Sequence, residues 1–183
     1  LVALNRLDSL QMRGLILDLR GNPGGYLHEA VAIADEFLGE EKSIVITKYG
    51  DGRMHTSKAS GGERYEDLPV HIIIDGNSAS ASEVVTGALQ DHDRATVYGS
   101  TSFGKGLVQE DKILSDGSKV RLTVAYYFTP SGRSIQKPYD GADLPGQMEG
   151  AVFTSDSGKV LLASGGIEPD IYLPADSSNS YYW

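Results

Sequence analysis

Residues 14–25, GLILDLRGNPGG, carry the pattern that decides the fold. Residues 14–19 form a short apolar run of the kind found in strands that are buried on both faces. The glycine-rich turn at 20–25 ends this run, and residues 26–38 then carry apolar side chains at helical spacing. The stretch therefore predicts a strand, a tight turn and a helix in succession.

A second unit of the same kind follows later in the chain. Residues 70–74 predict a strand, 75–77 a turn and 80–90 a helix, and residues 94–98 predict a further strand. Two strand-helix units with apolar strands are typical of a mostly parallel sheet covered by helices. The first half of the chain is therefore expected to adopt an α/β arrangement.

The remaining expected elements lie outside these two units. They are an amphipathic helix within 1–12, a hairpin of 43–47 and 54–57, strands at 107–108 and 119–128 joined through Ser115-Asp116-Gly117, a regular segment at 159–163 and a last strand at 171–173. The second half thus adds antiparallel structure. The fold class predicted is α/β, with a mixed sheet, flanking helices and antiparallel strands in the second half.

Composition narrows the possible partners. The 183 residues suit one domain, expected at 1–175 with a loose tail at 176–183. The Leu at position 1 predicts a processed form or an excised piece of a longer chain. With 16 Lys and Arg against 25 Asp and Glu, the formal net charge is -9, which argues against a nucleic-acid partner. The sequence has no Cys, which excludes disulfides and thiolate sites. No apolar run approaches the roughly 18 residues of a membrane span.

The four histidines give little indication of a metal site. They are His28, His55, His71 and His92, and no two stand at the i, i+4 spacing that places two imidazoles on one helical face. We therefore expect no metal. A Ser-His-Asp triad stays open, because triads assemble from segments that are distant in sequence.

Residues 99–106, GSTSFGKG, match the first seven positions of a phosphate-binding loop. The match fails at the eighth, where Gly106 replaces the hydroxyl residue, and a nucleotide site is disfavoured. Lys105 then has two interpretations: a solvated turn lysine, or an amine that its flanking glycines allow close to other backbone. In the second case burial would make it a usable general base.

Residues 77–83, NSASASE, also have two interpretations. Ser80 and Glu83 form a capping box at the start of the predicted helix. Alternatively, Ser80 is a nucleophile on a tight strand-to-helix turn, and the free amide of the next residue stabilises an oxyanion. Neither Ser80 nor Lys105 decides the question alone.

Several motifs taken together resemble one family, the C-terminal processing peptidases, also called tail-specific proteases. The similar segments are LDLRGNPGG at 17–25, SASASE at 78–83, GALQD at 87–91, FGKGLVQ at 103–109, YFTPSGR at 127–133 and GIEPD at 166–170. The resemblance covers nearly the whole chain in the family's order. It implies a crotonase-like or Clp-protease-like α/β core.

The resemblance also implies roles for individual residues. Ser80 matches the family's nucleophile, Lys105 its general base, and Gln109 the residue that orients the amine in several members. The backbone amide of Ala81, together with one from Gly24 or Gly25, would form the oxyanion hole.

Asp91 matches an acidic residue of the family. At 1.5 Å rise per residue it lies roughly 16 Å from Ser80 along one helix. We therefore interpret Asp91 as a structural group near the end of that helix and expect it to pair with Arg94.

The function implied is that of a serine endopeptidase core which cuts protein or peptide substrates and needs no cofactor. A cell-envelope location, periplasmic or exported, follows from resemblance alone. Relatives carry a PDZ domain that captures the substrate's C-terminus; one is expected in the full-length protein, and none is recognisable in this sequence. The alternatives are a catalytically silent scaffold or binding fragment and a crotonase-type acyl-CoA enzyme.

Overall fold

The structure is a computed structural model that describes residues 2–61, 65–138 and 152–174. Its elements are α1 (Val2–Ser9), β1 (Leu15–Asp18), α2 (Leu27–Asp35), β2 (Ser43–Tyr49), β3 (Met54–Lys58), β4 (Val70–Ile74), α3 (Ala81–Asp91), β5 (Ala95–Gly99), β6 (Leu107–Ile113), β7 (Lys119–Phe128), β8 (Val152–Thr154), β9 (Val160–Leu162) and β10 (Ile171–Tyr172). Only the short strand β8 was not expected from the sequence. The tail predicted at 176–183 lies outside the described residues.

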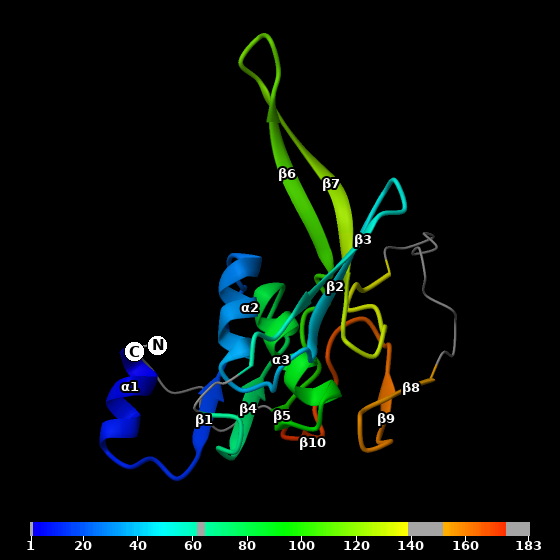
Figure 1. Cartoon of the computed structure of the whole chain (residues 1–183). Coiled ribbons are helices and arrows are strands. Elements are labelled where there is room, and N and C mark those ends of the chain that lie inside the picture. The colour runs from blue at the N-terminus through cyan, green and yellow to red at the C-terminus, as the bar shows by residue number, and fades with distance from the viewer. Residues whose placement is uncertain (1, 62–64, 139–151, 175–183) are drawn as a thin grey trace, which may run out of the picture.

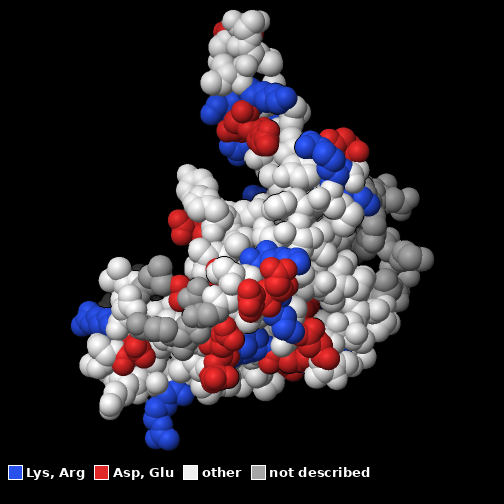
Figure 2. All heavy atoms as spheres, in the orientation of Figure 1, with Lys and Arg blue, Asp and Glu red and all other residues white. Residues whose placement is uncertain are grey.

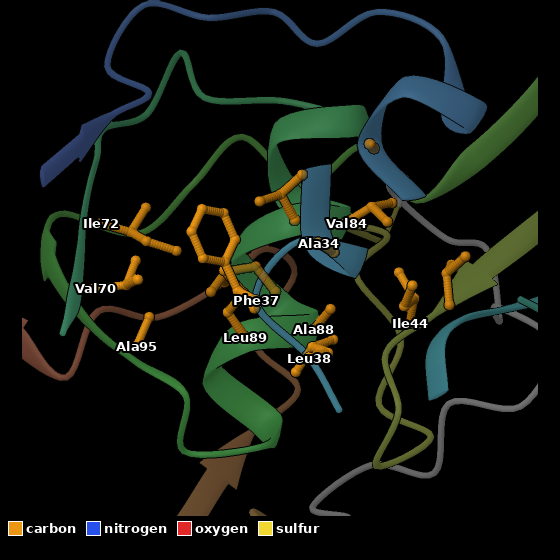
Figure 3. Close-up of a cluster of buried hydrophobic side chains, with 14 of the residues drawn as sticks. Ala34, Phe37, Leu38, Ile44, Val70, Ile72, Val84, Ala88, Leu89 and Ala95 are labelled. Atoms are coloured by element: carbon orange, nitrogen blue, oxygen red, sulfur yellow. The ribbon is translucent and has the colours of Figure 1, made fainter. Parts of the chain in front are cut away.

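A four-stranded parallel sheet, in the order β1-β4-β5-β10, forms the centre of the fold. Burial alternates along β4, so Val70, Ile72 and Ile74 are covered. Figure 3 shows Val70 and Ile72 close to Phe37, which follows α2, and Leu89 of α3. The two helices predicted from apolar periodicity therefore cover the face of the sheet that carries Val70, Ile72 and Ile74.

The antiparallel strands form a second sheet, in the order β3-β2-β7-β6. The α/β class is confirmed, but parallel and antiparallel strands lie in separate sheets instead of one mixed sheet. Short turns join β2 to β3 and β6 to β7, so hairpin partners pair with each other, whereas parallel strands need longer crossovers. β6 and β7 extend beyond the body as a two-stranded arm (Figure 1).

The parallel sheet determines where functional residues gather. β1, β4 and β5 are neighbours that run in one direction, so their carboxyl ends meet at one edge. The segments after these ends contain the Gly24–Gly25 turn, Ser80 and Lys105 in that order. Open α/β sheets bind ligands at this edge. Among the described helices, none is long and apolar enough to cross a membrane.

Candidate active site

Ser80 directly precedes α3 in a strained backbone conformation. Its φ is 57° and its ψ is -115°, a region that costs a residue with a side chain about 1–3 kcal/mol. The Ser80 N–H donates to Glu83 Oε2 at 2.7 Å, and the Ser80 carbonyl accepts from the Glu83 and Val84 N–H groups at 2.9 and 3.0 Å. Glu83 therefore caps the helix, as the capping-box pattern predicts, and holds Ser80 in its turn.

The glycine-rich turn after β1 packs on the turn that leads to Ser80. The Asp75 carboxylate accepts from the Gly21 N–H at 2.9 Å and the Asn77 N–H at 3.0 Å. Burial opposes ionisation of Asp75, but these hydrogen bonds prevail and lower its pKa. The Ala79 N–H donates to the Asn22 carbonyl at 3.0 Å. Two segments more than fifty residues apart are thus joined beside the candidate nucleophile.

Gly24 and Gly25 differ in the use of their amides. The Gly24 N–H donates to Asn22 Oδ1 at 2.9 Å. Among the described residues, no acceptor bonds the N–H of Gly25 or of Ala81. Gly24, Gly25 and Ala81 line an apolar cavity of about 150 Å³, and Gly25 also lines the cavity that contains Ser80. Two unbonded amides therefore lie where the oxyanion donors were expected.

Position 24 requires glycine for two reasons, its φ of 95° and its close contacts with neighbouring backbone. A Cβ there would lie 2.5 Å from the Ala79 carbonyl oxygen and 2.7 Å from the Ala81 nitrogen. We expect Gly24→Ala to lower stability by at least about 2 kcal/mol, since backbone strain and overlap add. Peptidase activity should fall as the turn moves away from Ser80, and thermal unfolding together with a peptide-cleavage assay measures both effects.

Gly21→Ala is the matched control for that substitution. Gly21 also has a positive φ, 67°, but no atom lies within 4 Å of an added Cβ. The Gly21→Ala substitution should lower the free energy of unfolding by only about 1–2 kcal/mol, through backbone strain, and leave turnover close to wild type. Equal losses of activity in the two variants would contradict the packing argument.

A single buried carboxylate links Ser80 to the segment that carries Lys105. Glu83 is only 1% exposed. Its Oε1 accepts from the Ser102 hydroxyl at 2.6 Å and the Gly104 N–H at 2.7 Å, and its Oε2 accepts from the Lys105 N–H at 2.8 Å. Burial raises the pKa of Glu83, while these hydrogen bonds act in the opposite direction. Glu83 therefore positions both chain segments.

Lys105 lies between glycines that allow close backbone approach. A Cβ on Gly104 would lie 2.7 Å from the Gly165 carbonyl oxygen, and one on Gly106 would lie 2.5 Å from the Gln136 nitrogen. Both glycines therefore lie against other backbone, in positions where a side chain would not fit. The Lys105 side chain is half-buried.

The three residues expected to carry catalysis share one cavity of about 330 Å³. Ser80, Lys105 and Gln109 line it together with Gly25 and Tyr127. The Lys105 amine and the Ser80 hydroxyl, both in the described part of the chain, form no hydrogen bond with each other. Catalytic hydrogen bonds commonly tighten only when substrate binds. No described histidine lines this cavity, so a His-based triad is disfavoured.

The family model for peptidase family S41 matches residues 2–143. The chain belongs to peptidase family S41. It is 42% identical to a carboxy-terminal-processing protease of Bartonella bacilliformis over 132 residues, which are 72% of this chain and 30% of that protein. It is 44% identical to a carboxyl-terminal-processing protease of Synechocystis over 135 residues, which are 74% of this chain and 31% of that protein.

A solved structure shares the architecture of this S41 domain. The photosystem II D1 C-terminal processing protease has a TM-score of 0.72 and 32% identity, over 93% of this chain and 37% of that one. The S41 domain described above thus spans less than a third of the two curated relatives.

Asp91 occupies the far end of α3 in this S41 domain, away from Ser80. Arg133 Nη2 donates to Asp91 Oδ1 at 2.7 Å, and the Ser131 N–H donates to Asp91 Oδ2 at 2.9 Å. The expected pairing with Arg94 is wrong. The Arg94 guanidinium instead donates to the carbonyls of residues 37, 65 and 68, because it turns toward the segments around α2 and β4. Arg133 reaches Asp91 from a part of the chain 42 residues away.

Sequence reasoning missed the second function of Glu83. The capping-box spacing identified its bond to Ser80, but its bonds to Ser102, Gly104 and Lys105 depend on packing across about twenty residues. Among the described residues of this S41 domain, no cluster of three His, Asp or Glu side chains could hold a metal ion.

Glu83→Gln tests this link. The glutamine amide has one carbonyl oxygen where the carboxylate accepts from four donors, and its NH2 group would face another N–H. We therefore expect the free energy of unfolding to fall by about 1–3 kcal/mol and kcat to fall clearly. Because burial raises the folded-state pKa of Glu83, its stabilising contribution is complete below the unfolded pKa and declines as pH rises through the folded value.

The stability difference between wild type and Glu83→Gln should therefore be largest at acidic pH, as measured by denaturant unfolding from pH 4 to 8. Glu40→Gln, at an exposed position between α2 and β2, is the control for loss of a carboxylate. A Glu83→Gln protein with wild-type kcat would show that the link is dispensable.

Proposed function

We propose that this domain hydrolyses peptide bonds of protein substrates through an acyl-enzyme on Ser80. The observation that carries the proposal is the joint placement of a strained Ser80 and of Lys105 in one cavity, with both segments held by Glu83. The names of the relatives, carboxy-terminal-processing proteases, support the same chemistry. These names favour peptide-bond hydrolysis over acyl-CoA chemistry and over a catalytically silent scaffold.

The proposed reaction uses the amine of Lys105 in its neutral form. The amine removes the proton from the Ser80 hydroxyl, and Oγ attacks the scissile carbonyl carbon. As the tetrahedral intermediate collapses, the C–N bond breaks and the lysine ammonium gives its proton to the leaving amine. Water, deprotonated by Lys105, then attacks the ester and releases the acid and Ser80. Gln109, which lines the same cavity, would orient the amine.

The Gly25 and Ala81 amides are the proposed donors to the oxyanion. Both N–H groups lack an acceptor among the described residues, whereas the Gly24 N–H is engaged by Asn22. Ala81 is the first residue of α3, so the positive end of the helix dipole adds to the stabilisation. Gly25 is thereby favoured over Gly24.

Measurement of new amino termini tests the proposed function. The complete gene product is incubated with an unfolded protein such as reduced casein, and the released α-amino groups are labelled and counted. Wild type should generate them, Ser80→Ala should generate none above background, and Ser9→Ala, the same change on an exposed residue of α1, should match wild type. Equal cleavage by wild type and Ser80→Ala would overturn the proposal. The cell-envelope location and the PDZ domain of the full-length protein stay predictions.

A further inference from the structure

We propose that the free edge of β6 is a docking strand for substrate, which binds in extended form as a fifth strand of the sheet β3-β2-β7-β6. The inference rests on the proposed peptidase function and adds a recognition mode to it. The docking strand is defined as residues 109–113. Its occupant is an unfolded segment of a polypeptide, recognised through its main chain.

The hydrogen-bond register of the arm identifies which groups face outward. β6 lies at the edge of its sheet with β7 as its partner. The Leu114 N–H donates to the Ser118 carbonyl at 2.8 Å, so that pair is hydrogen-bonded. In an antiparallel ladder such pairs recur at every second residue, so the main-chain N–H and C=O groups of Lys112 and Glu110 point toward β7. The main chains of Gln109, Asp111 and Ile113 therefore point away from β7.

The outward main-chain groups of these three residues are N–H donors and C=O acceptors that could pair with another strand. Within the described chain, no residue hydrogen-bonds to their N–H or C=O groups on the outer side. Residues 109–113 are also exposed. From Gln109 to Ile113 the strand measures about 13 Å, which would pair with about five residues of an extended peptide. A peptide-sized edge is therefore available.

The docking strand leads directly into the cavity lined by Ser80 and Lys105. We therefore infer that the polypeptide bound along the strand is substrate. β6 begins two residues after Lys105. Gln109 and Asp111 line the same cavity as Ser80 and Lys105. A peptide strand laid along this edge would therefore run directly into the cavity that holds the nucleophile.

Charged side chains protect the edge from permanent pairing with another copy. Glu110, Asp111 and Lys112 are consecutive and exposed, a device that soluble proteins use on edge strands. Arg121 donates to Asp111 at 2.7 Å and lowers its pKa to about 2, so the carboxylate stays ionised. Figure 2 shows acidic and basic side chains together on the arm. Main-chain recognition at such an edge gives affinity with little dependence on sequence.

An N-methyl scan of a substrate peptide tests the docking directly. A fluorescent peptide of about twelve residues, taken from a cleaved site in casein, is bound to the Ser80→Ala variant and followed by anisotropy. N-methylation at each position in turn should weaken binding about three- to tenfold at alternate residues over a stretch of about five, since each removes one hydrogen bond. Losses without a period of two, or no losses, would overturn the proposal.

A proline substitution tests the same edge from the enzyme side. Ile113→Pro removes an outward N–H without removing a bond to β7, and Ile113→Ala keeps that N–H while shortening the same side chain. Ile113→Pro should raise KM for the long peptide about three- to tenfold and leave hydrolysis of a short activated ester unchanged, whereas Ile113→Ala, which keeps the N–H, should raise KM less than Ile113→Pro does. Equal KM values for the two variants would count against docking.

Two further outcomes have separate meanings. Wild type that hydrolyses neither substrate defeats the proposed function, while the binding scan still decides the docking. A dimer in light scattering that Ile113→Pro dissociates, without any change in peptide affinity, would assign the edge to a second copy and overturn the proposal.

Discussion

Replacement of Lys105 by Arg is expected to lower kcat for peptide hydrolysis by about 10²- to 10⁴-fold. The guanidinium keeps the positive charge but does not release its proton at working pH, so it cannot accept the proton of Ser80. The Lys105 N–H that donates to Glu83 is main chain and survives the change. Active-site titration and steady-state kinetics with a fluorogenic peptide measure the effect, and Lys105→Met should be equally inactive.

The comparison between Arg and Met separates two possible functions of the lysine. If Lys105 acts only as a positive charge, Lys105→Arg should keep most of the activity while Lys105→Met loses it. If it acts as the base, both variants should be inactive. Lys58→Arg, an exposed lysine on β3 that pairs with Glu41, is the matched control and should retain wild-type kcat.

The second large effect is expected on stability, from the buried ion pair of Asp91 and Arg133. Their side chains are 1% and 2% exposed, respectively. Asp91→Ala leaves a buried guanidinium without its anion and should cost about 3–5 kcal/mol. For a domain of this size each kcal/mol lowers Tm by about 2–4 °C, so the melting temperature should fall by at least about 6 °C. Calorimetry or circular dichroism measures it.

A double variant and a surface pair serve as controls for this prediction. Asp91→Leu combined with Arg133→Met removes both charges, and it should be less destabilised than the sum of the two single changes. Arg53→Ala breaks the exposed pair with Asp51 and should cost no more than about 1 kcal/mol. Similar losses for Arg53→Ala and Asp91→Ala would show that burial does not govern the effect.

Local patterns were enough to predict most of the elements. The apolar run at 14–19 and its glycine turn gave β1 and the approach to α2, and residues 70–90 gave β4 and α3. The Ser80–Glu83 spacing predicted the cap at the start of α3, which the structure confirms. Each of these features depends on residues close in sequence, because strand, turn and helix preferences arise from neighbouring side chains.

The relations between distant segments were not predictable in the same way. Residues 99–106 left Lys105 with two interpretations, and the close packing of its flanking glycines against Gly165 and Gln136 became visible only in the tertiary structure. The choice between Gly24 and Gly25 depended on the Asn22 side chain, which engages one amide and leaves the other unbonded. The division of the strands into a parallel and an antiparallel sheet was not predicted, because strand pairing is decided by which edges meet, and periodicity does not specify that.

By itself, then, the sequence determined the succession of strand-helix units, the cap at Ser80 and the candidate pair of Ser80 and Lys105. Tertiary structure decided that Glu83 joins the two segments, that Arg133 and not Arg94 pairs with Asp91, and that β6 is the end strand of its sheet in the described part of the chain, beside the cavity. The physical reason is the separation along the chain over which each kind of interaction acts. Backbone preferences act over a few residues, whereas a buried charge is satisfied by whichever donors packing brings to it, however distant they are in the chain.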